Sequence, residues 1–266
     1  MRLYYRGMDI HFGCTQCGAC CRDTKIPLTV AEAIAWLNRG HDVQLLCEGS
    51  PWPAALDGDP KATHFKRRSF PVMSGSMPAR VVVILAANVV GACPNLVTDQ
   101  RCGIYETRPL VCRIYPAEIN PFIRFQSKNK ACPPEAWTAD RPLLQREGVL
   151  MDSTIAQGIE LSRATDARDA EVKGRACAAL NVMDTAMVHE AMLAYSPAAA
   201  TLLAALTGAM ATDTPEGPHP QWRFASDRTE TIAALSTGGA EAFQLDRAAA
   251  ADYQHFDARR EAIFGF

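Results

Sequence analysis

The 266-residue sequence has no apolar run long enough to span a membrane. Its longest apolar stretch, residues 81–90, includes Asn88 and falls far short of the roughly 20 residues that a spanning helix needs. The amino terminus lacks the charged start and the apolar run of about 7–15 residues that direct secretion. We therefore expect a soluble cytoplasmic protein. In the reducing cytoplasm, clustered cysteines bind metals more often than they form disulfides.

Familiar catalytic motifs are missing as well. The sequence has no Ser-His-Asp order, no paired-carboxylate site, no phosphate-cradling loop and no H-E-x-x-H helix. Its one glycine-rich candidate for a nucleotide loop, residues 236–239, does not follow a convincing strand. The sequence therefore assigns no catalytic residue.

Positive charge is too sparse for a nucleic-acid-binding protein. The chain has 27 Lys+Arg against 29 Asp+Glu, a net charge of −2. Residues 1–140 hold 16 Lys+Arg against 12 Asp+Glu, and residues 141–266 hold 11 against 17. A nucleic-acid footprint should be far more basic, whereas a small positive excess would offset the negative charge of metal-bound thiolates. We expect no nucleic-acid partner.

Cysteine is abundant, and its distribution indicates two regions. Nine of the ten cysteines precede residue 133, and the chain becomes rich in alanine beyond about residue 140. This shift predicts a cysteine-cluster metal-binding domain over residues 1–140 and a mainly helical, alanine-rich region over residues 141–266, with a proline-rich linker near 212–221. The predicted fold class is α+β, in which a small irregular cysteine-rich domain precedes a mostly α-helical region.

Local patterns predict a few elements in the first region. Thr29 and Glu32 form a capping-box pattern, which predicts an amphipathic helix over residues 29–39. Five consecutive Val, Ile and Leu residues predict a buried strand over 81–85. Alternating residues at 123–126 predict a half-exposed strand.

Other segments are predicted to be irregular or helical. Five prolines and several glycines within residues 41–79 predict a long irregular excursion. From about residue 150 onward, apolar residues at three and four spacings predict helices, including residues 172–193. Ser196 and Pro197 are typical of a helix start, as N-cap and first helical residue.

Four thiols within eight residues are the strongest functional signal. The run is Cys14-x-x-Cys17-x-x-Cys20-Cys21. A two-residue gap lets the chain turn so that both sulfurs face one centre, and Gly18 allows the tight backbone that such a loop requires. Similar C-x2-C-x2-C runs enclose the cluster of bacterial ferredoxins. Cys20 and Cys21 are adjacent and their side chains diverge, so they could serve two centres.

Three segments of the sequence resemble one known family. They are FGCTQCGACC, CPNLVTDQRCGIYETRPLVCRIYP and a final cysteine, together spanning about residues 12–134. They are similar to the YkgJ-like cysteine-cluster proteins, a family of zinc- or iron-chelating CxxCxxCC domains whose cluster also occurs in flagellin lysine N-methylase. The resemblance implies eight metal-binding cysteines: Cys14, Cys17, Cys20, Cys21, Cys93, Cys102, Cys112 and Cys132. It also implies that Tyr105, Arg108 and Arg113 accompany the cofactor, with Pro109 beside them.

The remaining candidates have simpler interpretations. Cys47 and Cys177 are expected to be unligated thiols, since cysteine often behaves as a small buried apolar residue. His11, three residues ahead of the first cysteine, is more simply a surface imidazole than a ligand. Arg101, like the two arginines of the motif, could donate to cluster sulfur, or it could form a structural salt bridge.

Two cofactors remain open, and three functions follow. Structural zinc usually takes paired C-x2-C knuckles, whereas the last four cysteines here are separated by gaps of 8, 9 and 19 residues. This wide spacing favours an iron–sulfur cluster, most simply [4Fe–4S]. The first hypothesis is an iron–sulfur redox or electron-transfer protein, and so an oxidoreductase if an enzyme, with an unidentified protein redox partner. The second is a zinc-stabilised binding module without catalysis. The third, from the methylase resemblance, is a methyltransferase-related protein.

Overall fold

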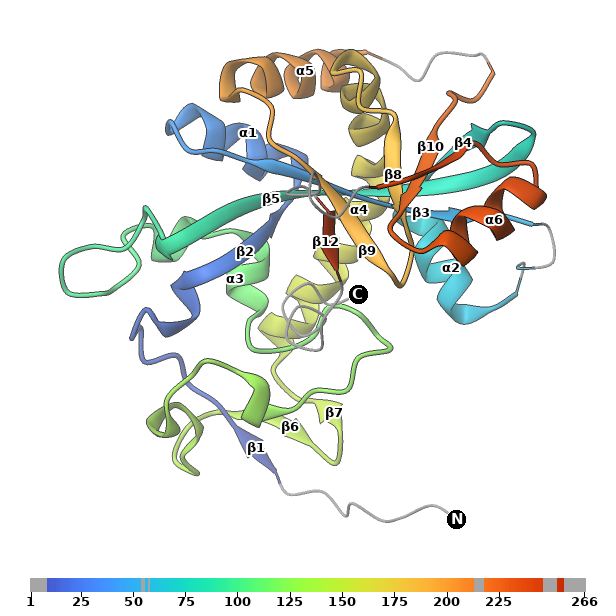
Figure 1. Cartoon of the computed structure of the whole chain (residues 1–266). Coiled ribbons are helices and arrows are strands. Elements are labelled where there is room, and N and C mark those ends of the chain that lie inside the picture. Colours follow the sequence, from blue (N-terminus) through green and yellow to red (C-terminus); the bar gives the residue numbers. More distant parts are fainter. Residues whose placement is uncertain (1–8, 54–55, 57, 213–217, 246–252, 256–266) are drawn as a thin grey trace, which may run out of the picture. The chain divides into compact units, whose positions relative to one another are not determined.

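The computed structural model describes residues 9–53, 56, 58–212, 218–245 and 253–255 (Figure 1). The chain is 37% helical and 28% strand, which confirms the predicted mixture of α and β structure. It divides into two compact units. Unit 1 comprises Met1–Ile26, Asn88–Arg163 and Ala262–Phe266, and unit 2 comprises Pro27–Ala87 and Ala164–Glu261.

Most strands of a nine-stranded sheet belong to unit 2. Its hydrogen-bonded order is β11-β10-β8-β3-β5-β2, with β4 paired to β5 and β9 paired to both β3 and β12. The strands are β2 (Arg22–Leu28), β3 (Gln44–Pro51), β4 (Phe70–Ser74), β5 (Met77–Ala92), β8 (Asp184–Met187), β9 (Ala191–Tyr195), β10 (Arg223–Ser226), β11 (Ala242–Gln244) and β12 (Tyr253–His255). β3 runs antiparallel to β5 and parallel to β8, and β10 runs parallel to β8 and β11.

The two central strands account for the longest apolar run in the sequence. Every residue from 81 to 87 on β5 is buried, as is every residue from 45 to 49 on β3. Leu45 pairs with Leu85 in their register. Strands covered on both faces read as continuous apolar runs, so the prediction of a buried strand over 81–85 is confirmed.

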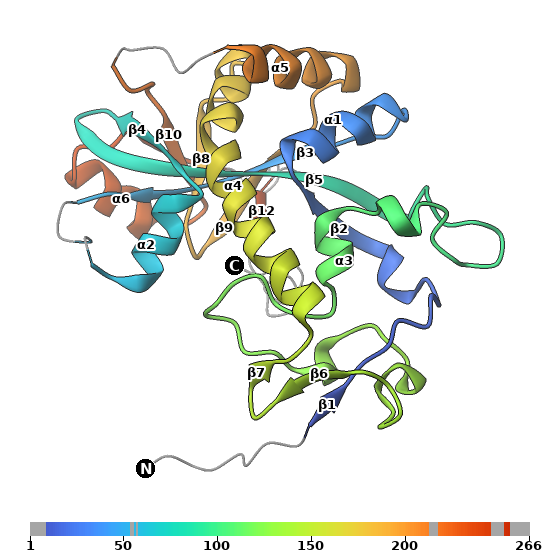
Figure 2. The ribbon, with the colours of Figure 1, turned by 180° about the vertical axis from the view of Figure 1, so that it is seen from behind.

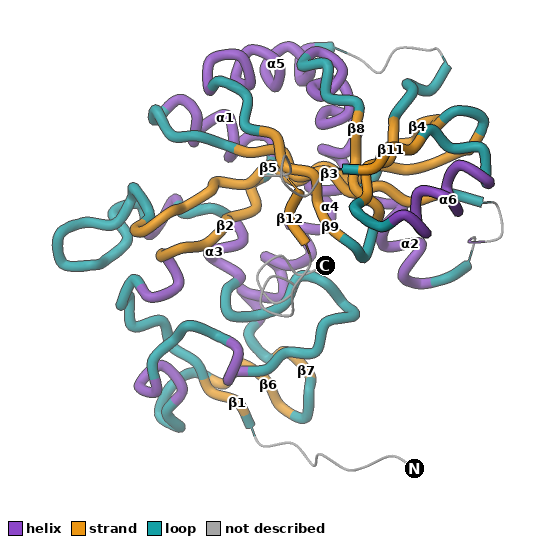
Figure 3. Tube along the Cα trace, in the orientation of Figure 1, coloured by secondary structure: helices purple, strands orange, loops and turns teal. Residues whose placement is uncertain are grey.

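Helices accompany the strands of unit 2 (Figures 2 and 3). They are α1 (Val30–Asn38), α2 (Pro60–Arg67), α5 (Ala199–Ala211), α6 (Thr229–Thr237) and the second part of α4 (Ser153–Ala179). The predicted capping box is confirmed in α1: the Glu32 amide donates to Thr29 Oγ1 over 3.2 Å, and the Thr29 amide donates to Glu32 Oε2 over 3.0 Å. The buried residues of α1 include Trp36, and the helix packs against α5.

The prediction of an irregular excursion over 41–79 is wrong, because the prolines lie where regular structure tolerates them. Pro51 ends β3, and Pro60 lies in the first turn of α2 behind the Asp59 cap. Of the other three, Pro71 lies in β4, Pro78 lies near the start of β5, and Pro53 lies in the loop after β3. A proline lacks an amide donor, which costs little at a strand end or in the first turn of a helix.

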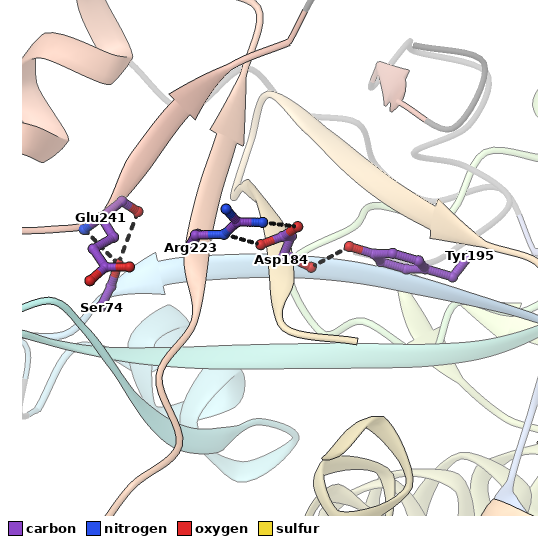
Figure 4. A network of polar contacts seen from close by, with 5 residues as sticks. All are labelled: Ser74, Asp184, Tyr195, Arg223 and Glu241. Carbon is purple, nitrogen blue, oxygen red and sulfur yellow. Dashed lines mark hydrogen bonds and ion pairs between the residues drawn. The ribbon is translucent and has the colours of Figure 1, made fainter. Parts of the chain in front are cut away.

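Polar side chains link the strands at one part of unit 2 (Figure 4). Arg223 on β10 forms two hydrogen bonds with the Asp184 carboxylate on β8, of 2.7 and 2.9 Å. The Tyr195 hydroxyl on β9 donates to the Asp184 carbonyl over 3.0 Å, and Ser74 Oγ exchanges hydrogen bonds with the backbone of Glu241. These contacts tie β4, β8, β9 and β10 to their neighbours, which is a structural role.

Unit 1 is built around a small apolar core. A three-stranded sheet contains β1 (Ile10–His11), β6 (Leu143–Arg146) and β7 (Val149–Leu150), in the order β1-β6-β7. Leu110 and Ile114 of α3 (Leu110–Ile114) pack with residues of β6 and with the first part of α4. Short 3-10 helices fill the connections: η1 (Ala19–Cys21), η3 (Tyr105–Thr107), η4 (Ser127–Asn129) and η5 (Pro134–Trp137).

Several predictions for later segments are wrong. Residues 123–126 form no strand, and Phe125 instead packs its ring against Trp137. Residues 172–193 are not one helix: α4 ends at Ala179, and β8 and part of β9 follow. The expected helix start at Ser196 is displaced, since α5 has Ala198 as its N-cap. Within the expected linker near 212–221, residues 213–217 lie outside the described residues.

The predicted organisation also differs from the compact units. A boundary near residue 140 falls inside unit 1, and residues 27–87 group with the second half of the chain because their strands pair with β8 and β9. The region 141–266 carries seven strands beside its helices among the described residues, so a mainly helical region is not confirmed. No described helix has the length and hydropathy needed to cross a membrane.

Candidate metal centre

All eight cysteines of the motif belong to unit 1, whereas Cys47 and Cys177 belong to unit 2. Cys14, Cys17 and Cys20 are exposed, and Cys21 is half-buried. They occupy a segment without regular structure that ends in η1 and leads into β2. The compact run therefore presents three of its four sulfurs to solvent.

Gly18 sets the turn within this run, as expected. Its φ of 71° lies in the left-handed region, which only glycine adopts at little cost. A Cβ atom at this position would also lie 2.7 Å from the Gln100 carbonyl oxygen. Glycine is needed here both for its backbone conformation and because the loop that carries Cys102 passes so close.

Strand pairing brings the run beside two later cysteines. Cys21 lies just before β2 and Cys93 just after β5, and the Cys93 amide donates to the Cys21 carbonyl over 2.8 Å. Cys102 follows in the same loop, where it bridges to Leu96. Burial raises the pKa of the Cys93 thiol, and the like charges of Cys21 and Cys102 raise it further. We call Cys21, Cys93 and Cys102 the Cys21 group.

A second set of thiols gathers around Cys132. Burial raises the pKa of the Cys132 thiol, the like charges of Cys17 and Cys14 raise it further, and a hydrogen bond from Tyr115 lowers it. We call Cys14, Cys17 and Cys132 the Cys132 group. These residues come from opposite ends of the motif, so the charges of the early run act on a later thiol.

Cys20 stands between the two groups. Its sulfur lies 3.9 Å from the Cys21 sulfur, and this contact, together with burial, raises the pKa of Cys21. Its charge also acts on Tyr115, the neighbour of Cys132. The expectation that adjacent cysteines could serve two centres is compatible with this position.

Cys112 lies half-buried on α3. Its amide donates to the Pro109 carbonyl over 2.9 Å, and its own carbonyl accepts a 3.3 Å bond from Arg108 Nε. Arg108 also donates to the Tyr105 carbonyl over 2.6 Å and lies 3.7 Å above the Tyr105 ring. The Tyr105 hydroxyl hydrogen-bonds with the Cys14 side chain, which connects this segment to the Cys132 group.

The polar residues predicted near the site have varied roles. Arg101 forms a structural salt bridge with Asp99 over 2.5 Å, which is the simpler of the two roles weighed for it. Arg113 is exposed at the end of α3. The Nδ1 atom of His11 hydrogen-bonds with the Arg141 carbonyl over 2.7 Å, which favours the simple interpretation of this imidazole.

Sequence reasoning missed Tyr115 and Lys130. Tyr115 contacts Cys132 through its hydroxyl, and burial raises its pKa. The Lys130 ammonium lies 2.5 Å from Glu118, with side chains 4% and 10% exposed. A tyrosine beside Cys112 and a lysine two residues before Cys132 were the available signals, but many surface residues look the same in a sequence.

The donors fit a thiophilic metal in kind, since eight thiols with nearby hydrogen-bond donors match zinc or iron–sulfur ligation. These thiols are not, however, gathered as one set of ligands. Among the residues that the structure describes, no three His, Cys, Asp or Glu side chains are close enough together to hold one ion.

The two cysteines of unit 2 form a separate pair. Cys47 on β3 and Cys177 on α4 are both fully buried. Burial raises the pKa of Cys47, as does its hydrogen bond with the Cys177 thiol. Their placement is that of small core side chains, which agrees with the expectation of unligated thiols.

The candidate nucleotide loop at 236–239 also has the wrong context. These residues end α6 and follow it, whereas a phosphate-binding loop connects a strand to the start of a helix. The geometry gives no support to the methyltransferase hypothesis.

Comparison with known proteins identifies part of the chain. No curated protein and no solved structure matches it. One family model does match, over residues 13–133, somewhat less than half of the chain, and its description is "Putative zinc- or iron-chelating domain". The expected resemblance is therefore confirmed, since residues 13–133 match the model of the CxxCxxCC domain.

Proposed function

We propose that unit 1 holds one or two cysteine-ligated metal centres. The observation that carries this proposal is that the Cys93 amide donates to the Cys21 carbonyl over 2.8 Å, and that thiols of the early run act electrostatically on Cys93 and Cys132. The match to a zinc- or iron-chelating domain supports metal binding. Eight thiols suit two four-thiolate sites, and Cys20 and Cys112 are the ligands left to complete the two groups.

The metal we favour is an iron–sulfur cluster, most simply [4Fe–4S]. Such a cluster, when bound, supplies one-electron transfer, so the proposed role is redox or electron transfer with a protein partner in the reducing cytoplasm. The chain would supply the thiolates, and hydrogen bonds from Tyr105 and Tyr115 to cysteine sulfur would tune them. The spread of the last four cysteines along the chain supports this choice.

Zinc is the second candidate, and the description of the family names it beside iron. The exposed segment of Cys14 and Cys17 has no regular structure, so part of the binding energy of a structural metal would go into ordering it. Binding energy would then become folding energy, and the protein would be a binding module without catalysis.

Metal analysis of the full chain separates these proposals. After anaerobic purification, stoichiometric iron with matching sulfide and a brown visible absorption band supports the cluster. A colourless protein with stoichiometric zinc supports the module. A protein with neither metal, before and after reconstitution, overturns both.

Serine variants test the two thiol groups. We expect Cys132→Ser and Cys21→Ser each to lose part of the bound metal if there are two centres, and each to lose all of it if there is one. Cys177→Ser is the matched control, because this thiol is buried in unit 2. Equal metal loss from all three variants would contradict the assignment of ligands.

A further inference from the structure

Aromatic side chains hold the backbone on both sides of Cys132, although its thiol is half-exposed. Immediately before it, the Ala131 amide donates to the Tyr115 hydroxyl oxygen over 2.8 Å. On the other side, the indole Nε1 of Trp137 donates to the Cys132 carbonyl over 3.3 Å. Both aromatic side chains belong to unit 1, and Trp137 packs with Phe12 and Phe125. The position of Cys132 is therefore fixed by the core of this unit.

A buried ion pair adds a second anchor one residue further back. The Lys130 ammonium lies 2.5 Å from a Glu118 carboxylate oxygen, and it lies 5.6 and 5.8 Å from the ring centres of Tyr115 and Phe125. Its side chain is only 4% exposed. Burying two charges is costly, so such a pair is weak evidence for stability and is often better explained by a specific positional role. The pair places a fixed positive charge two residues before Cys132.

The Tyr115 hydroxyl connects these features to the sulfur. A phenol oxygen can accept one hydrogen bond while its own proton is donated to another atom. Here the oxygen accepts from the Ala131 amide and the hydroxyl is hydrogen-bonded to the Cys132 thiol. The Ala131 amide thus fixes the position of the Tyr115 hydroxyl without a bound metal.

Cys14 and Cys17 present a contrast. Both are exposed on a segment without regular structure. The segment also has a contact of its own to unit 1, between Cys14 and the Tyr105 hydroxyl. One ligand of the Cys132 group is therefore held by the core of unit 1, whereas the other two are exposed on a segment without regular structure.

We propose that Tyr115 and Lys130 are positioning residues that preset Cys132 as the fixed thiolate around which the Cys14–Cys17 segment closes on a thiophilic divalent metal ion. The inference rests on the proposed metal-binding function and adds an order of assembly to it. Tyr115 donates to the sulfur, and Lys130 offsets the charge that accumulates as thiolates gather.

The test uses the metal-free, reduced full chain titrated with Co²⁺ alone, which prefers the same thiolate ligands as zinc and reports them through a charge-transfer band. Tyr115→Phe keeps the ring and removes the hydroxyl. Loss of an outer hydrogen-bond partner typically weakens metal affinity about 10–100-fold, and we expect this loss together with a shifted charge-transfer band. The matched control is Tyr195→Phe, whose hydroxyl serves a backbone carbonyl in unit 2, and it should titrate like the unmodified chain.

A second variant removes the ion pair without leaving a lone buried charge. Lys130→Met combined with Glu118→Gln replaces both charges by neutral groups of similar size, an exchange that folds usually tolerate. We expect weaker Co²⁺ binding at unchanged stability against urea. If both variants bind Co²⁺ with the affinity and spectrum of the unmodified chain, the inference is overturned while metal binding stands. If the unmodified chain binds no Co²⁺ and purifies without iron or zinc, the proposed function itself fails.

Discussion

A buried carboxylate in the sheet of unit 2 should make stability fall as the pH rises. Glu48 is only 4% exposed on β3, where it pairs with Val82 of β5 and Ala186 of β8. Burial raises its pKa from 4.5 to about 7, and the nearby charge of Arg68 opposes that shift only in part. The neutral acid is therefore the form that the folded chain prefers.

The sign follows from proton linkage. Below pH 4.5 the carboxyl is protonated in both the folded and the unfolded chain, and it causes no change in stability. Between pH 4.5 and about 7 the unfolded chain has released its proton and the folded chain has not, so the free energy of unfolding falls with rising pH. The difference of about 2.5 pKa units corresponds to roughly 3 kcal/mol, all of it lost above pH 7.

Replacing this side chain by its neutral isostere should remove the effect. We expect Glu48→Gln to lose the decline between pH 5 and 8 and to exceed the unmodified chain in stability by up to about 3 kcal/mol at pH 8. The measurement is urea unfolding followed by tryptophan fluorescence, which reports mainly on unit 2 because Trp36, Trp52 and Trp222 lie there.

The comparison with a control isolates this one group, since other groups also titrate in this range. Glu171→Gln on α4 is the matched control because it makes the same change at an exposed position. It should keep the pH dependence of the unmodified chain. Parallel stability curves for Glu48→Gln and the unmodified chain would refute the reasoning, because they would mean that the carboxylate is ionised at no cost in the fold.

Three further predictions concern the loop, the thiols and the helix cap. Gly18→Ala should destabilise the chain by at least about 1–2 kcal/mol, because of its left-handed φ, and should lower the metal content. Gly40→Ala, at a φ of 80° with open space for a Cβ, is the control and should keep its metal. Thermal melting and metal analysis measure both variants, and an equal loss of metal would contradict the close approach at Gly18. In the native, metal-free chain, iodoacetamide should label the three exposed thiols of the early run within minutes and Cys47 and Cys177 only after unfolding. Peptide mass spectrometry measures the labelling, and early labelling of Cys47 or Cys177 would show that this pair is not buried in solution. Thr29→Ala should cost about 1 kcal/mol in urea unfolding by removing the cap of α1, and an unchanged midpoint would mean that the cap is redundant.

Predictions from local patterns held where one short segment contains the whole cause. The capping box of α1 and the buried run of β5 are of this kind, because their partners lie a few residues away or their burial shows in their own composition. Predictions failed where pairing with distant strands decided the outcome. Residues 172–193 have apolar spacings that suit a helix, yet β8 and β9 form there because β3 offers hydrogen-bonding partners on the same sheet.

The sequence by itself determined the chemistry of this protein: eight thiols in a spacing that identifies the CxxCxxCC domain, a glycine at the tight turn between them, and two cysteines outside the pattern. Only the tertiary structure decided which thiols lie near one another. Pairing of β2 with β5 sets Cys21 beside Cys93, and the core of unit 1 sets Tyr115 and Lys130 beside Cys132. The reason is physical: residue type fixes which atoms can bind a metal, but the distance between segments far apart in the chain depends on which strands and side chains bury each other.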